Sequence, residues 1–542
     1  MPPALRVHRH VPLWLALALV PALSSCGGNP EAPRTPAPVA LPIRPDAPRR
    51  GGALRLPLAG IETLDPARSA SISENLIIQQ LFQGLVRFDT HLRVVPDLAS
   101  SWTLSDDRLT YTFHLDPRAR FHDGSEVTSA DVKTSLLRIM DRRLRSPARA
   151  YLMETLPDPD EAIECPDPRT VVVRLVRPDH VFIRTLAMQH TRIVPAHLCD
   201  ERDFARSPVG SGPFRLLTRE EGKLEIAPAF EDRENGPYVD RVIFLQLTGE
   251  QERAQFLSSE IDYTVAAASE RRFFEALGDS RLWLMPTLTL HFLALNVSKP
   301  PLDDPEVRRG LALALDRSAL ETKTQGRVQA ARTVLPPGMP GHDAKLDPYP
   351  HDPDRARELL AAARFPEGSR VLTILLGRIP EQEAVITILE EQLAAVGIGL
   401  DVSKTDDLGL FLRDLNRYDL GVVGWSADYP DPDNFFYNLF RTGAPYNFMG
   451  YSSTPIDELV EQGRRGEGKI DRARIYRRAE ETLQEDCPVV PLFHDAALHC
   501  VSRRVHGLRP TALGIYYTRL DEVWIEEEDE GLPALRPPGE AP

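Results

Sequence analysis

An aspartate in the last third of the chain has the setting of a ligand-binding carboxylate. Asp428 follows the apolar run Leu420–Trp425, which is typical of a buried strand. In open α/β sheets, ligand groups lie just beyond the carboxyl ends of strands, so Asp428 is well placed to meet a ligand. Capping a turn ahead of Pro430 is its alternative role. Trp425 and Tyr429 flank it and could pack on a ligand, stack on a cation or fill the core.

Short catalytic motifs are missing from the sequence. It has no G-x-S-x-G elbow, no H-E-x-x-H, no phosphate-binding G-x-x-x-x-G-K-[ST] and no G-x-G-x-x-G. His122 and Asp123 lack a third metal ligand at useful spacing, and with Gly124 they predict a turn instead. We therefore expect a binding protein without metal or cofactor, although an enzyme of this length could assemble a site from distant residues.

The composition predicts a large folded protein and argues against a nucleic-acid partner. The chain has 542 residues, of which 42% are hydrophobic, so it can bury a large core. At roughly 100–200 residues per domain, two to four domains are expected. Lys and Arg number 64 and Asp and Glu 79, a net charge of −15. A surface this acidic argues against nucleic acid, since phosphate binding needs basic residues.

The N-terminus has the features of an export signal. Arg6 and Arg9 precede an apolar stretch at residues 11–23, which leads to Leu23-Ser24-Ser25-Cys26. These four residues resemble the bacterial lipobox, in which the cysteine is diacylated and becomes the new N-terminus. Residues 1–25 would then be a lipoprotein signal peptide, with Cys26 as the lipid attachment site. An ordinary secretory signal that happens to contain a cysteine is the alternative.

The segment after the signal predicts a tether. Residues 27–50 hold seven prolines in 24 positions, a composition that favours extended chain over helix. Residues 26–50 would hold a folded body away from a membrane. In that body, Cys165, Cys199, Cys487 and Cys500 allow three disulfide pairings. Pairing of sequence neighbours and four free buried thiols both remain open.

Local patterns predict a mixed α/β body. Runs of β-branched residues predict strands at Thr170–Val176, Arg241–Leu247, Val371–Leu376 and Leu420–Trp425. Capping signals and apolar periodicity predict helices from Thr128 through Met140, after Asp304-Pro305, after Asp352-Pro353, and over 381–396 and 471–485. The acidic, proline-rich residues 528–542 predict a disordered tail.

An ordered set of short blocks runs through residues 52–525. The blocks are Thr63–Pro66, Leu81–Val86, Pro96–Trp102, Tyr111–Leu115, Phe121–Gly124, Ala130–Val132, Pro208–Phe214, Leu295-Asn296, Val307–Leu311, Ala314–Arg317, Gly424–Pro432 and Pro488–Phe493. Taken in order they resemble the peptide/nickel class of bacterial extracellular solute-binding proteins, family 5. Asp116 departs from the pattern, since relatives usually carry a basic residue there.

That resemblance implies an α/β, two-lobed periplasmic-binding-protein-like fold with an extra subdomain in lobe one. Lobe one would cover residues 51–290, with the subdomain inserted at about 86–207, and residues 500–527 would return to it. Lobe two would cover residues 291–499. Two crossing strands would join the lobes, and hinge closure would enclose the ligand and present a new surface to a partner.

The resemblance also implies roles for particular residues. Asp428 would hold the α-ammonium of a bound peptide, because a desolvated ammonium needs a carboxylate partner. Ser71 and Ile72 would lie in a loop whose backbone pairs with an extended peptide, unless that loop is plain surface. Arg378 would meet the ligand's carboxylate, unless it is simply exposed. Tyr151 would reach the ligand from lobe one.

The function implied is capture of di- or oligopeptides for an ABC importer. The partners would be the solute, the permease and ATPase complex, and a membrane reached through the lipid anchor. The protein would be a monomer at the periplasmic or cell-surface side. A nickel chelate, an opine or an oligosaccharide are alternative ligands, whereas a secreted hydrolase or a surface sensor are alternatives of another class.

Overall fold

The computed structural model describes residues 47–201, 203–231, 236–363, 370–377, 379, 381–466 and 471–526. Cys26, Arg378, the apolar run at 11–23 and the tail at 528–542 lie outside these residues. Below, lobe one means residues 51–290 with 500–526, and lobe two means residues 291–499.

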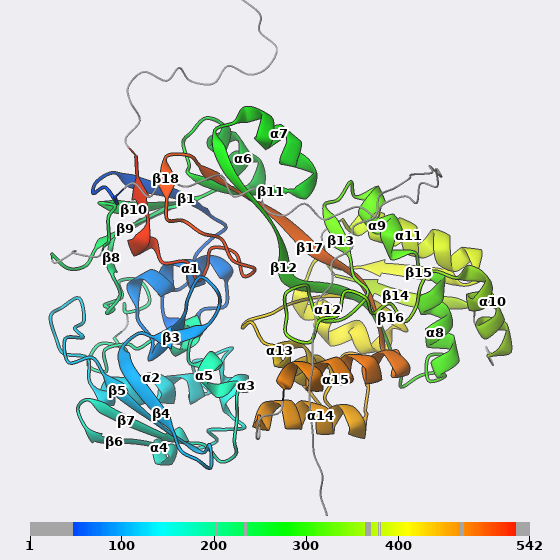
Figure 1. Ribbon diagram of the computed structural model, residues 1–542, viewed down its shortest axis with the longest axis horizontal. Helices are drawn as coiled ribbons and strands as arrows, with labels where there is room; N and C mark the ends of the chain where they lie inside the picture. The colour runs from blue at the N-terminus through cyan, green and yellow to red at the C-terminus, as the bar shows by residue number, and fades with distance from the viewer. Residues whose placement is uncertain are drawn as a thin grey trace, which may run out of the picture. The chain divides into compact units, whose positions relative to one another are not determined.

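Lobe one is built on a four-stranded sheet. Its order is β1 (Ala53–Leu58), β10 (Arg241–Gln246), β9 (Lys223–Pro228) and β8 (Phe214–Glu220). β1 runs parallel to β10, and the other pairs are antiparallel. Helix α1 (Ile72–Leu81) lies against this sheet, and the short C-terminal strands β18 (Val505–His506) and β19 (Trp524–Ile525) return to the same lobe (Figure 1).

Inside lobe one lies a second antiparallel sheet. Its order is β4 (Ala99–Leu104), β5 (Thr110–Leu115), β7 (Thr170–Arg174) and β6 (Ile163–Asp167). The hairpin of β2 (Val86–Phe88) and β3 (Val94–Pro96) precedes it. Its helices are α2 (Ser129–Met140), α3 (Arg149–Leu152), α4 (Pro159–Ala162) and α5 (Phe182–Thr185). We call residues 86–207 the inserted subdomain.

The largest sheet in the described residues belongs mainly to lobe two. Its order is β11 (Tyr263–Ala267), β17 (Val489–Ser502), β12 (Ser280–Leu295), β16 (Leu420–Ser426), β14 (Val371–Leu376) and β15 (Gly399–Lys404), with β13 (Val328–Ala330) also pairing β17. The helices of this region are α6 (Gly249–Leu257), α7 (Arg271–Leu277), α8 (Pro305–Ala314), α9 (Arg317–Lys323), α10 (Pro353–Ala362), α11 (Gln382–Ala395), α12 (Leu408–Asp414), α13 (Asp433–Phe435), α14 (Thr454–Arg465) and α15 (Arg472–Asp486).

Two long strands, β12 and β17, connect the lobes (Figure 1). Both predicted lobe boundaries fall inside these strands. Side chains of β12 alternate between two cores: Leu290 and Phe292 pack with one apolar cluster of lobe two, and Leu293 and Leu295 with the other. This period of two shows that both faces of the sheet are covered, as expected where helices flank a central strand.

Most local predictions agree with the structure. The four predicted strands are β7, β10, β14 and β16, and the Asp304-Pro305 and Asp352-Pro353 signals cap α8 and α10. The Thr128 backbone N–H donates to Asp131 at 2.8 Å, which completes the predicted capping box. His122, Asp123 and Gly124 form a turn with Gly124 at φ +89°.

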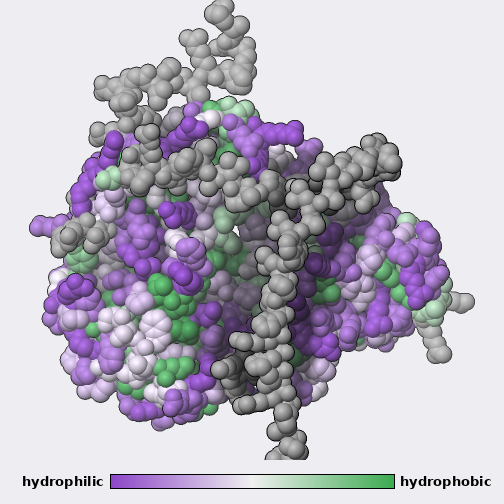
Figure 2. Space-filling view, viewed as in Figure 1, coloured by the Kyte–Doolittle hydropathy of each residue, from purple (hydrophilic) through white to green (hydrophobic). Residues whose placement is uncertain are grey.

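The structure decides between the two alternatives that were open for the cysteines. Cys165, Cys199, Cys487 and Cys500 are all free thiols, so no neighbour pairing is present. Among the described residues, no group of His, Cys, Asp and Glu has the geometry of a metal site. No helix in that same part of the chain is both long and apolar enough to cross a membrane. The face seen in Figure 2 is mostly hydrophilic, with scattered hydrophobic residues.

Candidate functional site

Asp428 stands where the lobes meet. It follows β16, whose end is fixed on the connecting strand β12: Ser426 pairs with Thr289, and the Ala427 N–H donates to the Leu288 carbonyl at 2.9 Å. The Asp428 carboxylate accepts a hydrogen bond from the Tyr151 hydroxyl of the inserted subdomain. Two residues predicted to contact ligand from opposite lobes are therefore brought together, although contact with a ligand itself stays a prediction.

Aromatic side chains surround this carboxylate. The Tyr517 hydroxyl donates to the Asp428 carbonyl at 3.3 Å. Trp425 is half-buried, lies 4.9 Å from the Tyr446 ring between centroids, and donates from Nε1 to Asn434 Oδ1 at 3.0 Å. Burial, followed by the charge of Asp428, raises the pKa of Tyr446.

In the described part of the chain, no arginine, lysine or histidine forms an ion pair with Asp428. Burial raises the pKa of its carboxyl, and the Tyr151 hydrogen bond only partly opposes that shift. Burial and the adjacent Asp428 charge likewise raise the pKa of Tyr151 well above its usual range. The site is thus a partly desolvated anion without a cation.

The next two aspartates along the chain, Asp431 and Asp433, differ sharply from Asp428 in having cationic partners. Asp431 receives both guanidinium nitrogens of Arg472, at 2.7 and 2.8 Å. Asp433 pairs with Arg464 at 3.3 Å and accepts the Tyr476 hydroxyl at 3.2 Å. Both side chains are fully buried and hold α13, α14 and α15 together. Of these three described aspartates, Asp428 alone has no cationic partner within the described residues.

Tyr429 occupies the core. Its side chain is 0% exposed, it donates to Asp433 Oδ2 at 3.0 Å, and its ring meets that of Tyr151 edge-on at 5.9 Å. Its full burial favours core packing, and a contact of Tyr429 with ligand stays a prediction. It packs among the apolar residues of the inserted subdomain, so this lobe-two side chain anchors the junction between the lobes.

Ser71 lies at the end of the expected loop, in extended conformation, whereas the loop expectation was wrong for Ile72. Ile72 is the first residue of α1, and Ser71 is its N-cap. The Ser71 N–H already donates to Glu74 Oε2 at 3.2 Å in a capping box, so it is not free to pair with a peptide. Both residues remain exposed, and a ligand contact there stays a prediction. Arg378 and Cys26 lie outside the described residues.

The blocks Phe121–Gly124 and Pro208–Phe214 are hydrogen-bonded to each other and have a structural role. The His122 N–H donates to the Gly210 carbonyl at 2.8 Å, and His122 Nε2 lies 3.0 Å from the Gly212 carbonyl. A Cβ at Gly210 would stand 1.9 Å from the Leu81 carbonyl, so only glycine lets this loop approach the end of α1.

The comparison with known families decides the class. Residues 93–447 match the bacterial extracellular solute-binding proteins, family 5. The chain belongs to that family. The resemblance seen in the sequence and the two-lobed α/β fold are therefore confirmed, and this family 5 protein is a binding protein rather than an enzyme.

Relatives of this family 5 protein include peptide binders. The probable di/tripeptide-binding protein 5 of Pseudomonas aeruginosa (strain UCBPP-PA14) is 29% identical over 471 residues, 80% of this chain and 88% of the relative. The DppA protein of Helicobacter pylori, solved with the peptide STSA, is 26% identical with a TM-score of 0.74, covering 88% and 99% of the two chains. AgaA of A. tumefaciens R10, solved with agropinic acid, matches with the same identity, TM-score and coverage.

Proposed function

We propose that this family 5 protein captures di- or oligopeptides between its lobes and delivers them to the permease of an ABC importer. The observation that carries the proposal is the Asp428 carboxylate, which is partly desolvated, bonded by a hydroxyl of the opposite lobe, and without a cationic partner among the described residues. A peptide α-ammonium has the charge and the three donors that this environment lacks.

The surroundings of Asp428 fit an ammonium better than a sugar hydroxyl. Trp425 and Tyr446 pack on each other with 4.9 Å between ring centroids, and the Asp428 charge contributes, after burial, to the raised pKa of Tyr446. Aromatic rings in such a setting can attract a cation. The named ligands of the P. aeruginosa and H. pylori relatives support a peptide. The agropinic acid complex of AgaA makes an opine the second candidate.

Calorimetric titration tests the proposal directly. The protein is unfolded and refolded to remove trapped solute, then titrated with a dipeptide, a tripeptide, the tetrapeptide STSA, agropinic acid, a nickel chelate and an oligosaccharide. We expect heat of binding from at least one peptide. Binding of one of the other solutes, with none of the peptides, would refute the peptide assignment and leave the family intact.

The proposal extends to the membrane. We infer that Cys26 is lipidated, that residues 26–50 tether the body, and that the protein works as a periplasmic or surface lipoprotein. More than one acyl chain is needed for stable attachment, and a diacylated, N-acylated cysteine supplies them. Intact-mass analysis after detergent extraction should show the lipid on the wild type and none on Cys26→Ser. An unlipidated wild type would contradict this part alone.

A further inference from the structure

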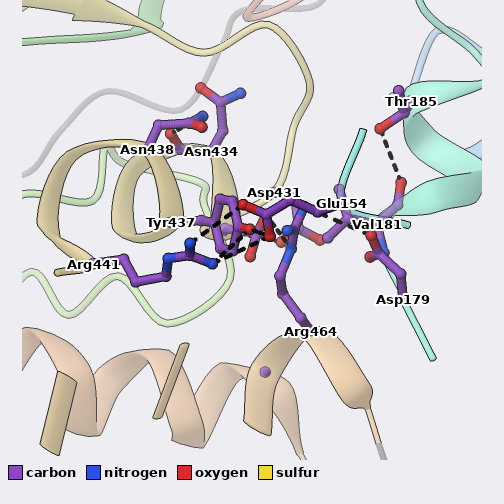
Figure 3. A network of polar contacts seen from close by, with 12 residues as sticks. Glu154, Asp179, Val181, Thr185, Asp431, Asn434, Tyr437, Asn438, Arg441 and Arg464 are labelled. Carbon is purple, nitrogen blue, oxygen red and sulfur yellow. Dashed lines mark hydrogen bonds and ion pairs between the residues drawn. The ribbon is translucent and has the colours of Figure 1, made fainter. Parts of the chain in front are cut away.

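A second set of contacts joins the lobes beside Asp428 without touching its carboxylate. Four ion pairs cross between the inserted subdomain and lobe two: Arg177–Glu461 at 3.3 Å, Arg184–Asp431 at 3.3 Å, Glu154–Arg441 at 3.2 Å and Asp179–Arg464 at 3.7 Å. We call these eight residues the latch. Figure 3 shows its central part, with Glu154 and Asp179 reaching the side chains of lobe two.

The latch is matched in charge. Each lobe contributes two arginines and two carboxylates, so each positive group meets a negative one across the junction and neither face carries excess charge. Asp179 and Arg464 are buried, with side chains only 3% and 5% exposed. The Arg177–Glu461 and Glu154–Arg441 pairs are partly exposed and lie at the rim. Buried pairs at the centre and solvated pairs at the edge are the anatomy of a protein–protein interface.

Backbone hydrogen bonds cross at the same place. The His180 N–H of the inserted subdomain donates to the Arg464 carbonyl of lobe two at 2.7 Å. Arg108 Nη1 donates to the Gly466 carbonyl at 2.9 Å. The latch is therefore more than a chance approach of long side chains, because the main chain of each lobe also takes part in bonds across the junction.

Most latch residues also have a partner within their own lobe. Asp431 is held by Arg472, Arg464 by Asp433, and Glu154 by Arg177 at 2.5 Å. Opening of the lobes would therefore leave few buried charges unpaired, and closing would need little rearrangement. Groups held in place beforehand lose less entropy when they bind, so the latch can form and break readily.

We propose that the latch holds the lobes together without ligand, so that this family 5 protein supplies part of its own closing free energy. For a ligand that binds only to the closed form, the apparent dissociation constant equals the intrinsic dissociation constant of that form divided by the fraction of molecules that are closed. A change in the latch then changes the dissociation constants of all solutes by the same factor, whereas a change at Asp428 changes the preference for one solute over another. This inference does not depend on the ligand's identity.

Hydrogen exchange at the His180 amide tests the latch directly, because that amide is bonded only across the junction. Exchange is followed at residue resolution on the refolded, ligand-free full-length protein. The Leu175 amide serves as the internal reference, since it donates to the Leu109 carbonyl within the inserted subdomain at 2.7 Å. Rapidly reversible opening makes the exchange rate proportional to the open fraction.

The variants are Asp179→Asn, at the buried centre, and Glu461→Gln, at the exposed rim. Asp179→Asn keeps an oxygen for the Val181 N–H, which Asp179 accepts at 2.8 Å. The matched control is Glu481→Gln, which removes an exposed ion pair with Arg478 inside α15 and crosses no junction. All four proteins are compared at about 0.01 M and about 1 M NaCl, where the screening length falls from about 30 Å to about 3 Å.

We expect His180 to exchange about tenfold faster in Asp179→Asn and about two- to fivefold faster in Glu461→Gln at low salt. Glu481→Gln should match the wild type, high salt should speed exchange in the wild type, and Leu175 should be unchanged throughout. The latch is refuted if His180 exchanges equally in all four proteins. Equal acceleration at Leu175 also refutes it, because that result reports loss of the subdomain fold instead.

Discussion

Replacing Asp428 with asparagine should weaken peptide binding while leaving the fold intact. The substitution keeps the side-chain shape and an oxygen for the Tyr151 hydroxyl, but it removes the negative charge. Burial raises the pKa of the Asp428 carboxyl, which means that the folded state disfavours its charged form. Removal of the negative charge should therefore not lower the free energy of unfolding. The effect of Asp428→Asn therefore falls on the bound ammonium.

The size of the loss follows from the environment of the carboxylate. Leaving a buried charge without its partner costs about 2–5 kcal/mol. Asp428 is half-buried, and the Tyr151 hydroxyl that bonds its side chain remains at the site, so the lower half of that range applies. About 2–3 kcal/mol corresponds to roughly 30- to 150-fold in dissociation constant.

A double-mutant cycle provides the decisive assay. Wild type and Asp428→Asn are titrated calorimetrically with a peptide that binds and with its N-acetylated form. Acetylation should hurt the wild type severely and the variant much less, because both changes remove one contact. Asp401→Asn, an exposed aspartate of β15 in the same lobe, controls for net charge. Additive losses would show that Asp428 does not hold the ammonium.

Three further outcomes are expected. Asp431→Asn should lower the free energy of unfolding by about 3 kcal/mol in urea titrations, since Arg472 loses its partner; an unchanged midpoint would contradict the pairing. Tyr151→Phe should weaken peptide binding about tenfold by loss of a hydrogen bond to a charged group, with unchanged affinity counting against closure over Asp428. Burial raises the pKa of Glu480 from 4.5 to about 7, so the folded state binds the proton more tightly and stability should fall by about 3 kcal/mol as pH rises through that window. Glu480→Gln should abolish this slope, and a variant that keeps it would disprove the assignment.

Local signals in the sequence predicted much of the fold. Asp352 before Pro353 marks a helix start within three residues, and the strand at 371–376 was recognised from its own β-branched run. The start of α1 is not predicted, although Ser71 and Glu74 have the spacing of a capping box, because the family resemblance implies a loop at this segment. Signals of this kind act within one turn of helix and need no knowledge of the partner lobe.

The site could be predicted only in part. Asp428 was found because it follows an apolar strand directly, a local feature. Tyr446 and Tyr517 are not predicted, since no nearby pattern separates them from ordinary core aromatics. The Tyr517 hydroxyl donates to the Asp428 carbonyl from far along the chain, and the Asp428 charge contributes, after burial, to the raised pKa of Tyr446. The roles of Tyr151 and Tyr429 also depend on the meeting of two lobes, which a single sequence does not encode locally.

The block that contains Asp428 shows how one short segment divides two tasks. Burial alone would raise the pKa of Asp431, but the Arg472 guanidinium outweighs burial and lowers it. The Asp431 carboxylate therefore has its cationic partner within the protein. Burial raises the pKa of Asp428, three residues earlier, and no cation among the described residues opposes that shift. An uncompensated carboxylate costs folding free energy, and a bound ammonium can return it as affinity. Asp431 is held by Arg472 and contributes to the latch through Arg184, and these contacts fix the segment that carries Asp428 at the junction, where a ligand's charge would pair with its carboxylate.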